Sequence, residues 1–217
     1  MKIKWLGHSA FLLTSENGTR ILTDPYESGS YGGAVGYKPI KEQVDIVTAS
    51  HSHEDHYYIK DLPEGFECIT DPGKHEVKGV TITGIKTYHD TSSGKERGRN
   101  IVFVIEIDGI RVCHLGDLGH LLSDDQVSAI GKVDVLLLPV GGFYTIGPKE
   151  ALSVMKALSP AITIPMHFKT DVLGFPIKPV EDFLSLAGDH EKAGTSEIEI
   201  KPDDLGSKRI VVLEHAL

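Results

Sequence analysis

Short runs of apolar residues separated by polar turns dominate the first half of the chain. These runs are rich in β-branched residues, which is typical of strands. We predict strands over residues 3–7, 10–15, 44–50, 67–70, 80–88, 101–109 and 110–116. Asn17-Gly18 predicts a hairpin with a type I′ turn, and Asp108-Gly109 predicts a second hairpin turn. The glycine-rich stretch 25–40 predicts a long loop.

The second half of the chain alternates between helical and strand patterns. Ser123 is a candidate N-cap ahead of two acidic residues, and Gly131 closes the same segment. The predicted helices are 123–131, 147–158 and 178–188, and the predicted strands are 133–140, 161–165, 196–200 and 209–214. The pattern therefore predicts one α/β domain of the α+β type over residues 1–217, with polar clusters at strand ends, where functional sites are usually built.

Composition and charge limit the partners and the cellular location that can be expected. The net charge of −9 disfavours a broad interface with nucleic acid or with an anionic membrane, so a small-molecule substrate is the expected partner. No apolar run approaches the roughly 20 residues that span a bilayer, and Gly7, His8 and Ser9 interrupt the apolar N-terminal stretch. Cys68 and Cys113 form no C-x-x-C pair or disulfide framework, so a cytoplasmic protein is expected. The sequence makes no prediction about the oligomeric state.

Three histidines and two carboxylates lie within six positions, His51 to His56, directly after the predicted strand 44–50. Neutral imidazole and carboxylate are ligands that suit Zn²⁺ and other borderline divalent metals. The loop offers four candidate ligands, His51, His53, Asp55 and His56. One tetrahedral ion that took all four would have no position left for substrate, so two ions are expected. The cluster by itself is also compatible with a solvated polar turn.

The spacing H-x-H-x-D-H after a strand resembles the signature of the metallo-β-lactamase-fold hydrolases. Further motifs of that family follow in its order: an aspartate after an early strand (Asp24), a histidine after a later strand (His89), a Gly-Asp element (Asp117) and a late histidine (His167). The resemblance implies a four-layer αββα sandwich of two mixed sheets with outer helices. It also implies two divalent metal ions, with Zn²⁺ as the leading metal and Mn²⁺, Ni²⁺ or Fe²⁺ as alternatives.

The same resemblance implies a role for each of these residues. One ion would be held by His51, His53 and His89 and the other by Asp55, His56 and His167, with Asp117 bridging the two. Such a pair of ions shares and activates a water molecule, and Asp55 would also orient that water. Asp24 would hold a ligand histidine through its free N–H. An ordinary turn aspartate before Pro25 is the alternative for Asp24.

Two other histidines compete for a place at the centre. His114 lies in a predicted strand three residues before Asp117, so the two side chains are expected on opposite faces. His75 is expected in a turn before a strand rather than after one. His89 ends its strand as the cluster does, and we therefore prefer it as the ligand.

The N-terminal "GHSAF", Gly7 to Phe11, and the stretch "PVGGFYTIGP" resemble small bacterial and archaeal metal-dependent hydrolases related to ascorbate-6-phosphate lactonase. In such proteins the early histidine lies near the metal centre. The resemblance therefore implies that His8 donates a proton to the leaving group or binds substrate. The alternative is a strand-end histidine that bonds only to backbone.

The loop after His89 is the most basic part of the chain, with Lys95, Arg97 and Arg99 against Glu96. Guanidinium groups bind phosphate and carboxylate in a bidentate fashion. Arg97 and Arg99 are therefore candidate substrate-binding residues for an anionic group. The alternative is a solvated loop whose arginines pair with surface acids.

The leading prediction is a binuclear metal-dependent hydrolase that uses a bridging hydroxide on a small, anionic ester, lactone or phosphodiester. The runner-up is a nuclease or phosphodiesterase acting on RNA or nucleotides, which is disfavoured because no basic RNA-binding insertion is visible. His53 argues against the di-iron redox relatives of this fold, which carry a carboxylate at that position. Mono-iron oxygenases keep both histidines and remain an alternative, as does a non-catalytic metal-binding protein.

Overall fold

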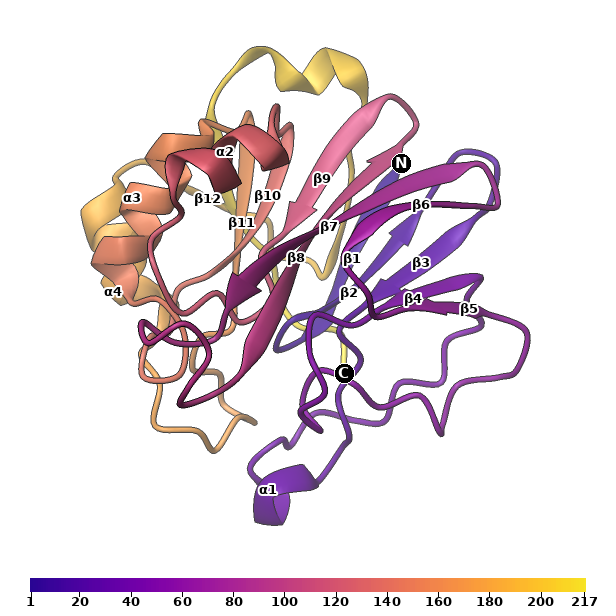
Figure 1. The fold of residues 1–217 in the computed structure, drawn as a ribbon, viewed down its shortest axis with the longest axis horizontal. Helices are drawn as coiled ribbons and strands as arrows, with labels where there is room; N and C mark the ends of the chain where they lie inside the picture. The colour runs from indigo at the N-terminus through magenta and orange to yellow at the C-terminus, as the bar shows by residue number, and fades with distance from the viewer.

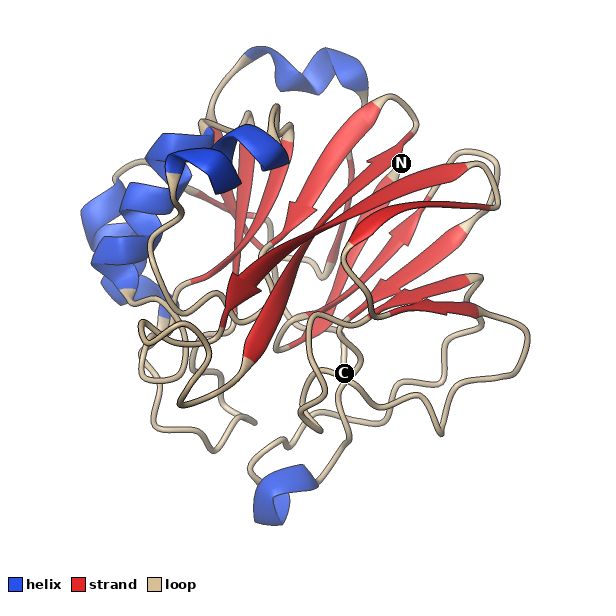
Figure 2. Ribbon diagram, viewed as in Figure 1, coloured by secondary structure: helices blue, strands red, loops and turns tan.

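The computed structural model describes all residues, 1–217, as a sandwich of two mixed β-sheets with helices (Figure 1, Figure 2). One sheet has six strands in the order β13-β1-β2-β3-β4-β5, and the other has eight in the order β12-β14-β11-β10-β9-β8-β7-β6. The strands of the first sheet are β1 Lys2–Gly7, β2 Ala10–Thr14, β3 Arg20–Thr23, β4 Ile46–Thr48, β5 Glu67–Ile69 and β13 Glu197–Glu199. Those of the second are β6 Gly73–Val77, β7 Val80–Tyr88, β8 Arg99–Ile107, β9 Ile110–His114, β10 Val135–Pro139, β11 Ile162–Met166, β12 Glu191–Lys192 and β14 Arg209–Val212.

Helices α2 Asp124–Ile130, α3 Pro148–Leu158 and α4 Val180–Ala187 follow strands of the eight-stranded sheet and pack on that side of the sandwich (Figure 2). A short helical turn, α1 Ser30–Gly33, and a 3₁₀ helix, Pro202–Gly206, complete the elements. Ser123 caps α2 as predicted, because its Oγ accepts from the N–H of Gln126 while the Gln126 side chain accepts from the N–H of Ser123. None of the helices combines the length and apolar character that a membrane span requires.

The topology gathers several strand ends at one edge of the sandwich. Strands β3 and β4 are parallel, and so are β9, β10 and β11. Strand β7 is antiparallel to β8, which is antiparallel to β9, so β7 and β9 also point the same way. The loops that leave the carboxyl ends of these strands lie at the lower edge of the molecule in Figure 1. Residues far apart in the sequence are thereby brought together there.

The two faces of the six-stranded sheet are both buried. Trp5, Phe11 and Ile21 belong to the main hydrophobic cluster, which also contains the eight-stranded sheet and its helices. Leu12 and Leu22, on the opposite face, belong to a second cluster. That cluster is completed by the loop residues Tyr26, Val35, Tyr37, Ile40, Val44, Leu62, Leu173, Phe175 and Ile177. The predicted sandwich of two mixed sheets with outer helices is confirmed. On its six-stranded side, loops cover the outer face of the sheet.

The predicted hairpin turn at Asp108-Gly109 is confirmed, since both residues have positive φ (52° and 76°) between paired strands β8 and β9. The type I′ turn predicted at Asn17-Gly18 is wrong. That turn needs positive φ at both central residues, and only Gly18 has it (91°). The loop between β2 and β3 is longer, and Ser15 N–H closes it by donating to Thr19 O across 2.9 Å.

His75 lies within strand β6 and not in a turn as predicted. The turn is supplied by Lys78-Gly79, which have positive φ values of 49° and 79° and join β6 to β7. Strand β6 is the edge strand of its sheet, and Lys74 and Glu76 give it a polar pattern. The sequence therefore offered no apolar signal for it.

Candidate metal centre

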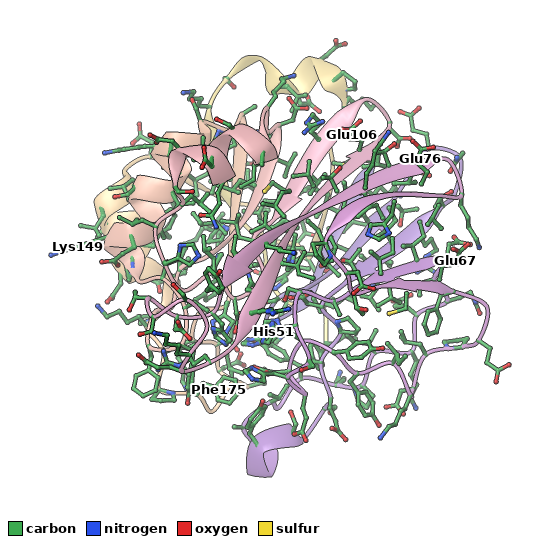
Figure 3. All side chains as sticks on the ribbon, in the orientation of Figure 1. His51, Glu67, Glu76, Glu106, Lys149 and Phe175 are labelled. Atoms are coloured by element: carbon green, nitrogen blue, oxygen red, sulfur yellow. The ribbon has the colours of Figure 1, made fainter.

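Every candidate metal ligand follows the end of a strand. The candidates and the strands they follow are His51, His53, Asp55 and His56 (β4), His89 (β7), Asp117 (β9) and His167 (β11). Asp24 follows β3 and His8 follows β1. Figure 3 labels His51 at the lower ends of the strands, with Phe175 below it. The centre is therefore built by both sheets at their shared edge.

The structure brings these residues together in two groups. The first, here the His51 group, contains His51, His53 and His89, with donor atoms within 4.8 Å of one another. The second, here the His56 group, contains Asp55, His56 and His167, and His8 lies within the same distance of its donor atoms. These are the two sets that the family resemblance implies.

Asp117 lies between the two groups. Its Oδ1 is 3.1 Å from His56 Nε2 and 3.4 Å from His167 Nε2. Its Oδ2 is 3.1 Å from His89 Nε2 and 4.0 Å from His51 Nε2. Each carboxylate oxygen thus faces one group of ligands, which is the arrangement of a carboxylate that bridges two cations.

The donor atoms are arranged for binding divalent metal ions rather than for hydrogen bonding to one another. Asp117 Oδ1, His56 Nε2 and His167 Nε2 are buried and have no hydrogen-bond partner, although they are only 3.1–3.4 Å apart. Buried polar atoms without partners are costly. Ligands of a tetrahedral zinc ion, each 2.0–2.1 Å from the metal, lie about 3.3 Å from one another. Donors that converge at this spacing without forming well-aligned hydrogen bonds are therefore suited to a metal ion.

His51 and His56 differ in charge state in the metal-free protein. Burial lowers the pKa of His51 to about 3, so its ring is neutral and can bind a metal. Burial would also lower the pKa of His56, but the charges of Asp117 and Asp55 raise it well above its ordinary value. The pKa of Asp117 is in turn held well below its usual range, because His167, His56 and His89 outweigh its burial. Metal binding would replace the proton on His56 and release it.

Asp24 supports a histidine of each group. Its Oδ2 accepts a hydrogen bond from His56 Nδ1 (2.8 Å) and another from Ser50 Oγ (2.5 Å). Ser50 Oγ in turn lies 2.9 Å from His51 Nδ1. Both histidines therefore keep Nε2 free for the centre. Asp24 has a positive φ of 41°, a conformation that costs free energy for a residue other than glycine and persists where the surroundings enforce it.

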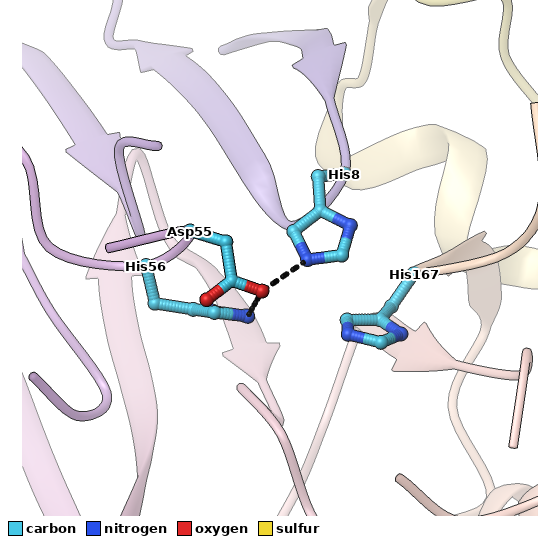
Figure 4. Close-up of side chains that lie close together, drawn as sticks. All are labelled: His8, Asp55, His56 and His167. Carbon is cyan, nitrogen blue, oxygen red and sulfur yellow. Dashed lines mark hydrogen bonds and ion pairs between the residues drawn. The ribbon is translucent and has the colours of Figure 1, made fainter. Parts of the chain in front are cut away.

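His8 is fully buried behind Asp55 (Figure 4). Its Nε2 lies 3.1 Å from Asp55 Oδ2, and its ring centroid is 4.2 Å from that of His167. The His8 carbonyl also accepts hydrogen bonds from Trp5 Nε1 and from the N–H of His167. His8 has no surface on the pocket, so the structure does not place it against a leaving group as predicted. It holds Asp55 and the backbone of His167 instead.

A pocket of about 270 Å³ opens over both groups. Its lining consists of Tyr31, His53, Asp55, His89, Glu96, Arg97, Asp117, Tyr144, His167 and Phe175. The guanidinium of Arg97 lies 5.9 Å from the ring centroid of Tyr144, within cation–π range. The predicted basic residue Arg97 thus faces the pocket, beside a tyrosine that sequence reasoning missed.

Arg99 does not line this pocket, contrary to the prediction for it. It is the first residue of β8 and pairs with Tyr88 of β7. Arg99 instead lines a second cavity, on the other side of His51, together with Ser50 and Lys86. The chain changes from loop to strand between Arg97 and Arg99, and the pattern of charges in the sequence could not show this change.

Asp90 organises the loop that carries Arg97. Its carboxylate accepts four backbone N–H groups at 2.7–3.0 Å, those of Ser92, Gly94, Glu96 and Arg97. These bonds hold the pKa of Asp90 well below its usual value, although its desolvation acts in the opposite direction. Sequence reasoning missed this residue. An aspartate followed by serines and glycine is a common signal for such side-chain-to-backbone turns.

The other histidines lie outside both groups. His114 is buried, with Nε2 2.8 Å from Ser9 O and Nδ1 accepting from the N–H of Gly116. His75 contacts Asp71 O from its edge strand. His120, which is close to Asp117 in sequence, accepts from the N–H of Tyr88 and does not line the pocket.

Comparisons with known proteins agree with this fold and this centre. A family model described as "Beta-lactamase superfamily domain" matches residues 2–167. The chain is similar to a UPF0173 metal-dependent hydrolase of Thermococcus onnurineus, with 30% identity over 94% of this chain and 98% of the relative. A second UPF0173 relative, from Thermococcus kodakarensis, is 31% identical over 87% of this chain and 93% of its own length.

A solved structure gives the same result. A Thermotoga maritima protein, classed as a Zn-dependent hydrolase of the metallo-beta-lactamase superfamily, is 43% identical and has a TM-score of 0.83, with 99% of each chain covered. Family model, relatives and structure all match across most of the sequence. The chain therefore belongs to the UPF0173 metal-dependent hydrolases of the metallo-β-lactamase superfamily.

Proposed function

We propose that the chain hydrolyses a small, anionic ester, lactone or phosphodiester with two divalent metal ions, Zn²⁺ being the leading metal. The position of Asp117 carries this proposal. One of its oxygens faces the His51 group and the other faces the His56 group, each with a histidine Nε2 at 3.1 Å. A single ion would leave one set of buried donors without a partner.

Two bound ions would supply a water molecule of lowered pKa and would polarise the bond that this water attacks. The residues of the chain would hold the ions and orient the water. The histidines would hold the ions once His56 has released its proton, and Asp24 keeps His51 and His56 in place through Ser50 and by direct contact. Asp55 would orient the attacking water, because its Oδ1 is turned toward the pocket and away from His8.

The pocket supports a small substrate with a negative charge. Its volume of about 270 Å³ is at the lower end of ligand pockets. Arg97 supplies a fixed cation to its wall, in a chain whose net charge is −9. The aromatic rings of Tyr31, Tyr144 and Phe175 supply an apolar wall. The lactone class rests on the resemblance of the N-terminal motif alone, and a cytoplasmic location remains an expectation from the sequence.

The test combines metal analysis with a substrate panel. Protein purified without a nickel column should contain close to two equivalents of zinc. It should also hydrolyse at least one of three probes, bis(p-nitrophenyl) phosphate, a carboxylate ester or a lactone. One equivalent of iron without hydrolysis would overturn the proposal in favour of the oxygenase alternative. Cleavage of RNA in preference to all small probes would favour the nuclease alternative.

Arg97 and Arg99 form a matched pair for testing the substrate charge. Replacing Arg97 by alanine should lower kcat/KM for an anionic substrate by about ten- to a hundredfold, since a hydrogen bond to a charged group contributes about 1.5–3 kcal/mol. A neutral substrate of the same shape should lose much less. Arg99→Ala, which removes the same charge outside the pocket, should discriminate little between them. Equal losses for charged and neutral substrates in Arg97→Ala would remove the case for an anionic substrate.

A further inference from the structure

The second cavity, here the Lys86 cavity, has a volume of about 540 Å³, compared with about 270 Å³ for the pocket over the two ligand groups. The proposed hydrolysis makes no use of it. Its lining comes from the ends of four strands: Ser50, His51 and Ser52 after β4, Thr70, Asp71 and Pro72 after β5, Lys86, Thr87 and Tyr88 of β7, and Arg99, Asn100 and Ile101 of β8. The cavity is thus built from both sheets, as the metal centre is.

The lining divides into a buried part and an exposed part. Asn100 is fully buried, and its amide donates to Thr87 Oγ1 at 2.8 Å and to Leu115 O at 2.9 Å. These bonds fix the buried part and use its polar groups. The exposed hydroxyls of Ser52 and Thr70 form no hydrogen bond within the chain, so they are available to a ligand.

Two cations stand on one wall of the cavity. In the antiparallel pair β7–β8, Lys86 lies opposite Ile101 and Tyr88 lies opposite Arg99. Lys86 and Arg99 are therefore diagonal neighbours on the same face of the sheet. Diagonal side chains of this kind start about 7–8 Å apart, and long side chains reach across that distance. One anion can therefore contact both cations.

Neither cation is neutralised by the chain. No carboxylate lies within 4.0 Å of Lys86 or Arg99, although the chain has 31 acidic and 22 basic residues. Asp71 lines the cavity but stays beyond this distance from both. Three of the other arginines pair with a carboxylate, namely Arg20, Arg111 and Arg209. The remaining one is Arg97, which lines the catalytic pocket. Neighbouring like charges without a partner are unfavourable, and a bound anion would remove this cost.

The Lys86 cavity and the catalytic pocket lie next to each other. His53 and His89 line the pocket, and their chain neighbours Ser52 and Tyr88 line the cavity. An anion in the cavity would therefore be either a separate ion or a second charged group of a molecule held at the metal centre.

We propose that the Lys86 cavity is a second anion-binding site, which takes a phosphate or carboxylate group between Lys86 and Arg99. The guanidinium of Arg99 offers two parallel N–H groups to such an oxyanion, and the ammonium of Lys86 adds a compact charge. The hydroxyls of Ser52 and Thr70 supply further donors. This inference goes beyond the proposed hydrolysis and does not depend on it, because binding alone defines the site.

Titration calorimetry with inorganic phosphate tests the site in the zinc-loaded protein at low ionic strength. The wild type should show a binding event that Lys86→Ala/Arg99→Ala weakens at least about tenfold, the usual effect of losing a hydrogen bond to a charged group. Arg97→Ala should leave this event intact. Added sodium chloride should weaken it, because both cations are exposed.

Lys38→Ala/Lys41→Ala is the matched control. It removes two exposed positive charges that have no carboxylate within 4.0 Å and that line neither the pocket nor the cavity. The control should bind phosphate as the wild type does. The inference would be overturned by equal weakening in the two double variants, or by phosphate binding that is unchanged in Lys86→Ala/Arg99→Ala. Absence of any phosphate binding to the wild type would overturn it as well.

Two 4-nitrophenyl esters distinguish the sources of the anion. One carries a single carboxylate on a short acyl chain, and the other carries an additional phosphate at the end of a longer chain. If the site holds a group of the substrate, Lys86→Ala/Arg99→Ala should raise KM about tenfold for the second ester only. If it holds a free ion, both KM values should stay unchanged while the calorimetric loss remains. Either result supports the site. Failure of the wild type to hydrolyse both esters would count against the proposed hydrolysis, and calorimetry would still decide the site.

Discussion

The His51 group and the His56 group differ in how the protein holds them. In the His56 group, His56 and His167 have no exposed surface, and Asp24 contacts His56 directly. In the His51 group, His53 is partly exposed on the pocket, and Asp24 reaches His51 only through Ser50 Oγ. The donors of the His56 group are therefore held by buried carboxylates, whereas those of the His51 group lie closer to solvent.

This difference suggests that the two groups differ in metal affinity. Buried, hydrogen-bonded ligands are oriented in advance and bind metal more tightly. A partly exposed ligand such as His53 can move with less cost, which suits a position where substrate enters. We expect the His56 group to bind its ion more tightly and the His51 group to exchange its ion more readily.

The largest expected effect comes from removing one ligand of each group. His167→Ala and His51→Ala should each lose most of one metal equivalent and lower hydrolysis by several orders of magnitude, because both ions act on the same water. Plasma emission analysis and steady-state rates measure the two quantities. Normal activity with unchanged metal content in either variant would refute the ligand assignment for that group.

The second prediction concerns stability without metal. His56→Ala removes the ion-pair partner of the buried Asp24 carboxylate, which keeps only its hydrogen bonds from Ser50, and should destabilise the metal-free protein by about 3–5 kcal/mol, the usual cost of breaking a buried ion pair. His53→Ala, at a partly exposed position, should stay within about 0.5 kcal/mol of the wild type. Urea unfolding followed by the fluorescence of the buried Trp5 measures both. Similar losses in the two variants would remove the contrast between the groups.

The sequence predicted which residues come together in the two groups better than it predicted their surroundings. His51, His53, Asp55 and His56 form one continuous motif, so their proximity needs no knowledge of the fold. His167 could be placed by its position after a strand, since parallel strands end at a common edge. Spacing and strand order therefore carry most of the information about the candidate ligands.

The surroundings depend on the path of loops and on side-chain direction, which no pattern in the sequence reveals. Tyr31 reaches Asp55 only because its backbone is left-handed. Arg99 was predicted for the pocket because of its charge, yet strand pairing turns it into another cavity. His8 lies near the centre as expected, but the sequence could not show that its ring is fully buried against Asp55.

The third prediction compares the two residues that orient the histidines. Asp24→Ala removes support from both groups and should weaken both zinc-binding events, each by about 10–100-fold, the usual effect of losing a hydrogen-bond partner of a ligand. Ser50→Ala breaks the link to His51 but leaves the direct contact between Asp24 and His56, so it should weaken one event far more than the other. Competition with a chromophoric chelator resolves the two affinities. Equal weakening of both events in Ser50→Ala would show that the groups are coupled more closely than their contacts indicate.

The smallest expected effect, counted per pH unit, is the pH dependence of the metal-free protein, in which His51 and His56 should act in opposite directions. The pKa of His51 is lowered to about 3 by burial, so between that pH and about 6.5 the unfolded chain binds a proton that the folded chain does not. His51 therefore makes stability rise with pH in this window, and His8, whose pKa burial lowers to about 4, acts in the same way. The pKa of His56 is raised well above its ordinary value despite burial, because of Asp117 and Asp55, so its contribution is complete below about pH 6.5 and is lost as the pH rises through the raised value.

The metal-free protein should consequently be most stable near neutral pH. Each titrating side chain changes the free energy of unfolding by at most about 1.4 kcal/mol per pH unit. The carboxylates of the centre do not obscure the acid window, since Asp24, Asp55 and Asp117 all have pKa values below their usual range and affect stability only below about pH 4. Replacing His51 by glutamine should flatten the slope between pH 4 and 6.5, whereas His56→Gln should remove the loss on the alkaline side. Urea titrations across pH 4–9 measure both slopes. If His51→Gln left the acid slope unchanged, the burial of the His51 ring would not be what sets its charge, and the two groups would differ less than their exposure suggests.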